Sequence, residues 1–220
     1  MMFQAAIFDM DGLLLDTERL CMRVFKEACS AQSLPFHEEA YLSMIGCNGA
    51  GIEAILRRAY HDDYPRVNRA WRERYREVVY HQAIDLKPGV ITLLEWLKRR
   101  DVPIAVATST PKETAVVKLR LAGLDHYFHN VTTGCEVTRG KPDPEIYLLA
   151  ARRLGVDPQR CLAFEDSNNG ARAAVGAGMK TYQVPDLVEP SPEVRALGHS
   201  IVESLSEALR LISQDATLTS

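Results

Sequence analysis

The chain has 220 residues, of which 46% are hydrophobic and 25% are charged, the composition of an ordinary globular protein. Its formal net charge of -3 at pH 7 gives no general electrostatic attraction to nucleic acid or to an anionic membrane. No apolar run approaches the roughly 18 residues of a membrane-spanning helix. The N-terminus has no basic leader and the five cysteines form no C-x-x-C pair, so we expect a cytoplasmic protein without a disulfide framework or a zinc site.

Strands are predicted from short apolar runs that end in polar residues. The first run, residues 5–8, stops at Asp9, and the second, residues 102–107, stops at Thr108. Further strands are expected at residues 131–133, 161–164 and 181–184. The clearest of these runs are continuous rather than alternating, which indicates strands covered on both faces, as in a parallel sheet.

Helical patterns lie between these strands. They cover residues 90–100, 114–121 and 145–154, where apolar side chains repeat at helical spacing. Gly123 and Gly155 stand where the last two of these helices should end. The alternation predicts an α/β fold, a Rossmann-like, doubly wound parallel sheet with right-handed crossovers.

The segment from residue 17 to residue 86 departs from this alternation. It contains four successive helical patterns and no convincing strand: residues 18–30, 38–45, 52–60 and 67–83. Because the segment stands between the first strand and the rest of the sheet, we expect an inserted all-helical cap domain. Residues 1–16 and 87–220 are predicted to form the α/β core domain, and residues 17–86 the cap domain.

Polar clusters follow the predicted strands and one loop. They contain the candidate site residues Asp9 and Asp11, Thr108 and Ser109, Lys141, and Glu165 and Asp166. Open parallel sheets bind ligands beyond the carboxyl ends of their strands, so these side chains should meet in one crevice. Carboxylates that meet without a partner repel one another. A divalent cation removes this conflict, and carboxylate oxygens without histidine or thiol favour Mg²⁺.

With Mg²⁺ in place, these residues suit phosphoryl transfer. Asp9 can attack phosphorus, because the metal and Lys141 screen its charge from the phosphate oxygens. Asp11, two residues further along an extended backbone, can protonate the leaving oxygen and then activate a water molecule. Thr108 and the backbone near Ser109 can bind the phosphoryl oxygens close to a helix start, and Lys141 can stabilise the transition-state charge.

Each motif has an ordinary structural explanation when it is taken alone. An Asp-x-Asp pair can simply end a strand, and a lysine before a proline is commonly an exposed loop residue. Glu165-Asp166-Ser167 would serve as the N-terminal cap of a helix. The functional prediction therefore depends on the combination and the order of the motifs.

In combination and order, the motifs resemble those of the haloacid dehalogenase-like hydrolases. The matching segments are Asp9-Met10-Asp11-Gly12-Leu13-Leu14-Leu15-Asp16-Thr17-Glu18, Ala107-Thr108-Ser109, Gly140-Lys141-Pro142-Asp143-Pro144, and Phe164-Glu165-Asp166-Ser167 with Gly170. Together they span nearly the whole chain. The branch most resembled is that of the β-phosphoglucomutases and sugar-phosphate phosphatases, which has a helical cap between the first two motifs.

The resemblance implies a role for each residue. Asp9 would form an aspartyl-phosphate, and Asp11 would act as acid and base. Thr108 and Lys141 would bind the phosphoryl group. Mg²⁺ would be held by the Asp9 carboxylate, the Asp11 main-chain carbonyl and the Asp166 carboxylate. Glu165 would bind it through a water molecule or would contact these ligands without binding the metal.

Two departures from the β-phosphoglucomutases favour hydrolysis. Those mutases carry a cap histidine where this chain has Cys21, and a cap arginine for the distal phosphate where it has Gly46-Cys47-Asn48-Gly49. Without these groups a bisphosphate intermediate would be poorly held. We therefore predict a Mg²⁺-dependent phosphatase for a small sugar- or polyol-phosphate-like metabolite. A phosphosugar mutase is the alternative, and a metal-independent dehalogenase and a catalytically silent binding protein are less favoured.

The expected partner is a small-molecule phosphomonoester, with no nucleic acid and no membrane involved. Substrate specificity is expected to come from cap side chains, with Glu18, Asn48 and the helix that contains Arg72 as candidates. The sequence does not fix the substrate or the oligomeric state.

Overall fold

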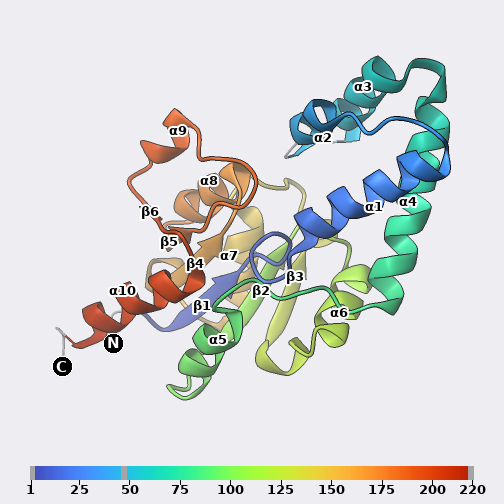
Figure 1. Cartoon of the computed structure of the whole chain (residues 1–220). Coiled ribbons are helices and arrows are strands. Elements are labelled where there is room, and N and C mark those ends of the chain that lie inside the picture. The colour runs from blue at the N-terminus through green and yellow to red at the C-terminus, as the bar shows by residue number, and fades with distance from the viewer. Residues whose placement is uncertain (1–2, 46–48, 218–220) are drawn as a thin grey trace.

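The centre of the protein is a six-stranded parallel sheet, seen in a computed structural model that describes residues 3–45 and 49–217 (Figure 1). Its strands are β1 (Ala5–Phe8), β2 (Ile104–Thr108), β3 (Asn130–Thr133), β4 (Cys161–Glu165), β5 (Lys180–Gln183) and β6 (Ser200–Ile201). The strand order is β3-β2-β1-β4-β5-β6, so the winding direction reverses between β1 and β4. The predicted doubly wound α/β fold is confirmed, and the reversal marks where such sheets bind ligands.

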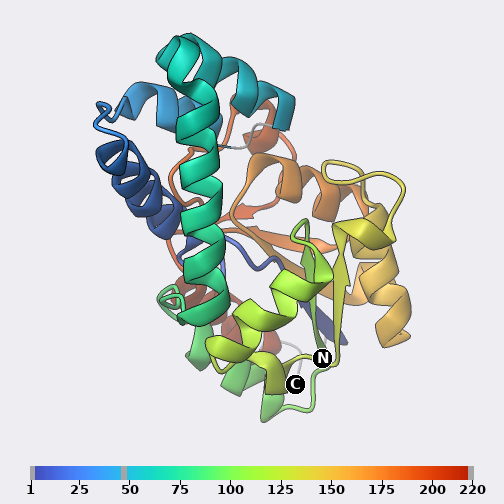
Figure 2. The same cartoon turned by 90° about the vertical axis from the view of Figure 1, so that its right-hand side faces the viewer.

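Helices cover both faces of the sheet (Figures 1 and 2). One face packs against α7 (Glu145–Leu154) and α8 (Asn168–Gly176), and the other against α5 (Val90–Lys98), α6 (Lys112–Leu121) and α10 (Leu205–Thr217). A short α9 (Pro192–Arg195) precedes β6. Successive residues of β1 alternate between the two apolar clusters, Ala6 and Phe8 in one, Ala5 and Ile7 in the other. Because both faces are covered, β1 is apolar throughout, as its sequence indicated.

The register of the sheet determines which side chains meet at its carboxyl edge. Phe8 of β1 lies beside Phe164 of β4, and their rings stack with centroids 4.5 Å apart. The next residues, Asp9 and Glu165, therefore emerge at the same level. Thr108 ends the neighbouring strand β2 on the other side of β1.

The insert between β1 and β2 consists of helices, as predicted: α1 (Thr17–Ala31), α2 (Glu38–Met44), α3 (Gly49–Tyr60) and α4 (Tyr64–His81). We call α1 to α4 the cap helices. They pack around their own apolar cluster, in which the Phe25 ring lies edge-on to Trp71 at 5.1 Å. The two connections to the sheet run side by side, because Leu15 bridges to Leu86. The exact division into domains at residues 16 and 87 stays a prediction.

No described helix is both long enough and apolar enough to cross a membrane.

Candidate active site

The candidate site lies beyond the carboxyl ends of β1 and β4, where a cavity of about 510 Å³ opens. Predicted site residues that line it are Asp9, Asp11, Glu18, Thr108, Ser109, Lys141 and Asp166. Glu165 is fully buried and contacts this lining through Lys141. Asn48 lies outside the described residues. The fold thus brings residues from both ends of the chain into one cavity.

Lys141 is a buried cation beside Asp9. Its ammonium donates to Asp9 Oδ1 at 2.5 Å, to Glu165 Oε1 at 2.5 Å and to the Ala107 carbonyl at 3.0 Å. Burial disfavours the charged form, but the two carboxylates outweigh it and raise the pKa of Lys141. Lys141 is therefore a fixed positive charge beside the Asp9 carboxylate.

Glu165 has both carboxylate oxygens engaged by protein donors. Besides Lys141, the Tyr147 hydroxyl donates to Oε1 at 2.7 Å. The backbone N–H of Asp166 and the hydroxyl of Ser167 donate to Oε2, each at 3.2 Å. Ser167 also caps α8, since its hydroxyl accepts from the Gly170 N–H at 3.0 Å. Glu165 is thereby fixed against the first turn of α8, with its Oε1 in contact with Lys141.

The Glu165 carboxylate occupies space that is open because residue 170 is a glycine. A Cβ at position 170 would lie 1.9 Å from the Glu165 carboxyl carbon, so Gly170→Ala forces that carboxylate out of place. We expect Gly170→Ala to lower kcat/KM and to lower the free energy of unfolding by about 1–3 kcal/mol, as overpacking of a filled interior does. Urea unfolding and steady-state kinetics measure both.

Gly176→Ala is the matched control on the same helix. A Cβ there meets only Pro144, at 3.7 Å, so it needs no rearrangement. Alanine is also the better helix former, and we expect unchanged kinetics with equal or slightly higher stability. Equal behaviour of the two variants would show that the position of Glu165 does not matter.

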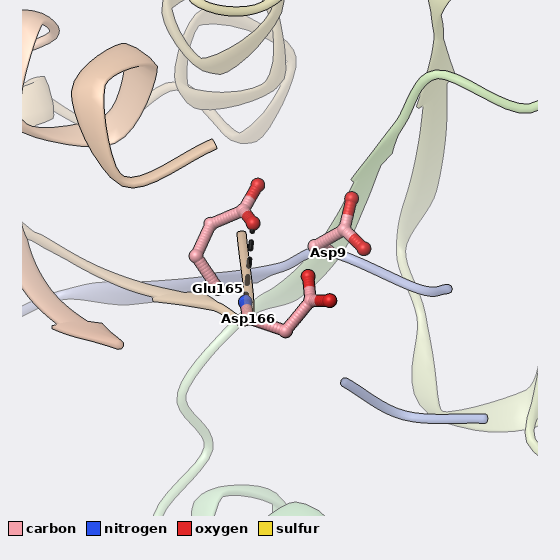
Figure 3. A group of neighbouring side chains, drawn as sticks. All are labelled: Asp9, Glu165 and Asp166. Atoms are coloured by element: carbon pink, nitrogen blue, oxygen red, sulfur yellow. Dashed lines mark hydrogen bonds between the residues drawn. The ribbon is translucent and has the colours of Figure 1, made fainter. Parts of the chain in front are cut away.

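Three carboxylates of the site lie close enough together to share a cation. Oxygens of Asp9, Glu165 and Asp166 lie within 4.8 Å of one another (Figure 3). Burial raises the pKa of Asp9 to about 7, with Lys141 opposing and Glu165 and Asp11 adding to the shift. Burial and the neighbouring carboxylates also raise the pKa of Asp166. One lysine does not offset this charge, and the all-oxygen donor set fits a hard divalent cation.

Asp11 also lines the cavity and has partners of its own. Its Oδ1 accepts from the Lys118 ammonium at 2.8 Å, and its Oδ2 from the Thr110 hydroxyl at 2.6 Å. Burial favours the neutral form of Asp11, but Lys118 and these hydrogen bonds outweigh it and lower its pKa. Lys118 was not among the predicted site residues.

The cap side, the start of α8 with Ser167, Asn168 and Asn169, and a core loop supply the rest of the lining. Glu18 and Ile45 come from the cap side, and the loop after β5 adds Asp186, Leu187 and Val188. Burial raises the pKa of Glu18, and the nearby carboxylate of Asp186 adds to the shift. The sequence analysis did not identify this loop.

Asp186 of that loop forms ion pairs with α1 and with the connection that returns from the cap. Its Oδ1 accepts from Lys87 at 2.6 Å and from Arg19 of α1 at 3.0 Å. Since Lys87 lies on the connection that returns from the cap, the ion pairs join the loop to α1 and to this connection.

A doubly wound sheet with acidic residues and a buried lysine at its switch point is typical of α/β enzymes, which bind their ligands at this place. Residues 3–178 match the family model of the haloacid dehalogenase-like hydrolases, and the chain belongs to this family of hydrolases. The resemblance inferred from the motifs is thereby confirmed.

Several relatives are known in this family. The "phosphorylated carbohydrates phosphatase" of Thermotoga maritima is 36% identical over 179 residues, covering 80% of this chain and 82% of the relative. A crystal structure of a provisionally assigned β-phosphoglucomutase from the same organism superposes with a TM-score of 0.82 at 32% identity, over 96% and 99% of the two chains. The crystal structure of CbbY from Rhodobacter sphaeroides in complex with xylulose-(1,5)bisphosphate superposes with a TM-score of 0.70 at 31% identity, over 93% of this chain and 96% of that one.

Proposed function

We propose that this hydrolase is a Mg²⁺-dependent phosphatase that acts on small sugar- or polyol-phosphate-like metabolites through an aspartyl-phosphate on Asp9. The observation that carries the proposal is the contact between the Lys141 ammonium and Asp9 Oδ1, in a cavity also lined by Thr108 and Ser109. A nucleophile and its phosphate-binding groups are thus held together. The relative named as a phosphorylated carbohydrates phosphatase supports the substrate class.

Two chemical steps account for hydrolysis. In the first, a carboxylate oxygen of Asp9 bonds to phosphorus, the bond from phosphorus to the ester oxygen breaks, and Asp11 gives a proton to the leaving oxygen. In the second, Asp11 takes a proton from the water that displaces Asp9 from phosphorus. Lys141 and the Thr108 and Ser109 groups bind the phosphoryl oxygens in both steps.

Asp9 and Asp166 are the carboxylates best suited to hold Mg²⁺, together with the Asp11 main-chain carbonyl. Glu165 is less suited, because Lys141, Tyr147 and other donors already occupy its oxygens. When bound, the metal offsets the repulsion between a carboxylate nucleophile and the phosphate oxygens. We assign Glu165 to orienting Lys141.

The leaving-group side of the cavity favours a monophosphate over a bisphosphate. Among the described residues that line it, Lys141 is the only lysine or arginine, and Glu18 and Asp186 add negative charge. Arg19 is engaged by Asp16 and Asp186. A second phosphate would meet no further lysine or arginine among these described lining residues, which favours hydrolysis over a mutase cycle with a bisphosphate intermediate.

A panel of sugar and polyol phosphates, assayed for phosphate release with Mg²⁺ or with EDTA, tests the proposal. We expect Mg²⁺-dependent release that EDTA reduces to background. Monophosphates should exceed the matching bisphosphates in kcat/KM by about 10-fold or more, since like charges repel. Isomerised hexose phosphate without free phosphate would instead support the mutase. Turnover that survives EDTA would exclude the metal-dependent mechanism, and absence of both turnover and Mg²⁺ binding would support a silent binding protein.

A further inference from the structure

Lys118 is a lysine of the core helix α6 whose side chain is only 3% exposed. Its ammonium donates to Asp11 Oδ1 at 2.8 Å and to the Tyr75 hydroxyl oxygen at 3.0 Å. Lysine is seldom buried this deeply without a specific partner, because removing an ammonium from water is costly. The partner here is the residue to which we assign proton transfer.

The Asp11 carboxylate is held at both of its oxygens. Lys118 binds Oδ1, and the Thr110 hydroxyl donates to Oδ2 at 2.6 Å. Two donors in fixed positions restrict rotation of a carboxylate, and general acid–base catalysis depends on such fixed geometry. Without Lys118, Asp11 would lose a charged donor and keep neutral hydroxyl donors, that of Thr110 among them.

Tyr75 connects this arrangement to the cap. It lies on α4, the long cap helix that reaches down to α6 of the core (Figure 2). A second phenol of α4 makes a similar link, since the Tyr80 hydroxyl lies 3.1 Å from the hydroxyl of Thr114 on α6. Of these two contacts between α4 and α6, the one through Tyr75 reaches Lys118 and, through it, Asp11.

We propose that Lys118 is a positioning residue that fixes the Asp11 carboxylate for proton transfer, and that Tyr75 makes this position depend on the packing of α4 against α6. The inference rests on the proposed function, in which Asp11 protonates the leaving oxygen. Lys118 acts through Asp11 and does not itself touch the substrate. The cap then contributes to proton transfer as well as to enclosing the substrate.

Dependence on the leaving group tests this role. The nitrophenolate of p-nitrophenyl phosphate departs without a proton, whereas the alkoxide of a sugar monophosphate needs one as the bond to phosphorus breaks. For Lys118→Met we expect kcat/KM to fall about 100-fold with the best sugar monophosphate of the panel, the lower end for loss of acid–base catalysis. With p-nitrophenyl phosphate it should stay within about threefold. The ratio of the two values cancels any loss of folded enzyme, and equal losses with both substrates would overturn the proposal.

Tyr75→Phe tests the link to the cap, with Tyr80→Phe as its matched control. Both variants remove one phenol hydroxyl between the same two helices. We expect Tyr75→Phe to reduce the sugar-phosphate to nitrophenyl-phosphate ratio about threefold to tenfold, the range of one hydrogen bond, and Tyr80→Phe to leave it unchanged. Equal ratios in the two variants would overturn the role of Tyr75. Should Lys118→Met not fold, this pair decides the proposal.

Asp11→Asn separates failure of this inference from failure of the proposed function. The variant should lose turnover of the sugar monophosphate at least as severely as Lys118→Met. If Asp11→Asn retains that turnover, the assignment of Asp11 as the acid is wrong. If Asp11→Asn loses it while Lys118→Met does not change the ratio, only the role of Lys118 is wrong.

Discussion

Asp9→Asn is expected to abolish phosphate release, with kcat at least about 10⁴-fold below that of the wild type, as loss of a covalent nucleophile typically causes. The substitution keeps the size of the side chain but removes the charged oxygen that would attack phosphorus. It also removes a carboxylate partner of Lys141. Mass spectrometry after acid quenching should find a phosphoryl adduct on the Asp9 peptide of the wild type and none in the variant.

Asp101→Asn is a suitable control for this experiment. Asp101 is exposed and precedes β2, at the opposite end of the sheet from the cavity. Its φ of 53° lies in the left-handed region, which asparagine tolerates well. We expect unchanged kcat in this variant. Comparable phosphate release by Asp9→Asn and the wild type would exclude Asp9 as the nucleophile.

The sequence predicted the centre of the fold because burial on both faces leaves a clear pattern. β1, β2 and β4 are fully buried and therefore read as continuous apolar runs. The polar residues that end them, Asp9 and Glu165 among them, then have to lie at the carboxyl edge. This is why most of the predicted lining meets in one cavity, although the residues lie far apart in the chain.

The elements that the sequence analysis missed have weaker or longer-range signals. β6 has two residues, too few for any pattern. α10 does carry an apolar stripe at helical spacing, with Leu205, Ala208 and Ile212 buried, and this signal could have been used. α8 was indicated only at its start, by Glu165-Asp166-Ser167 as an N-terminal cap.

Long-range ion pairs could not be predicted from local patterns. Lys118 has the sequence context of an ordinary helix lysine, and its partner Asp11 lies 107 positions away. Asp186 similarly finds Lys87 at a separation of 99 positions. All four residues lie in the segments predicted to form the core domain, so the pairs depend on how distant helices and loops of the core pack together rather than on local propensity. Residues of this kind emerge only from the folded arrangement.

Lys141→Met should impair both catalysis and folding. We expect kcat/KM to fall about 10²–10³-fold, the usual effect of losing one preorganised group that stabilises transition-state charge. The free energy of unfolding should fall by about 3–5 kcal/mol, because removing one member of a buried ion pair leaves the other charge without compensation. Denaturant unfolding and steady-state kinetics measure the two effects, with Lys98→Met, an exposed lysine of α5, as control.

Mg²⁺ distinguishes charge compensation from simple packing at this position. In Lys141→Met the carboxylates of Asp9, Glu165 and Asp166 lose their buried ammonium, so a divalent cation becomes their main source of positive charge. Added Mg²⁺ should therefore raise the unfolding free energy of Lys141→Met more than that of the wild type or of Lys98→Met. If Mg²⁺ stabilises all three proteins equally, the methionine acts through packing alone, and the electrostatic role of Lys141 in holding these carboxylates together is wrong.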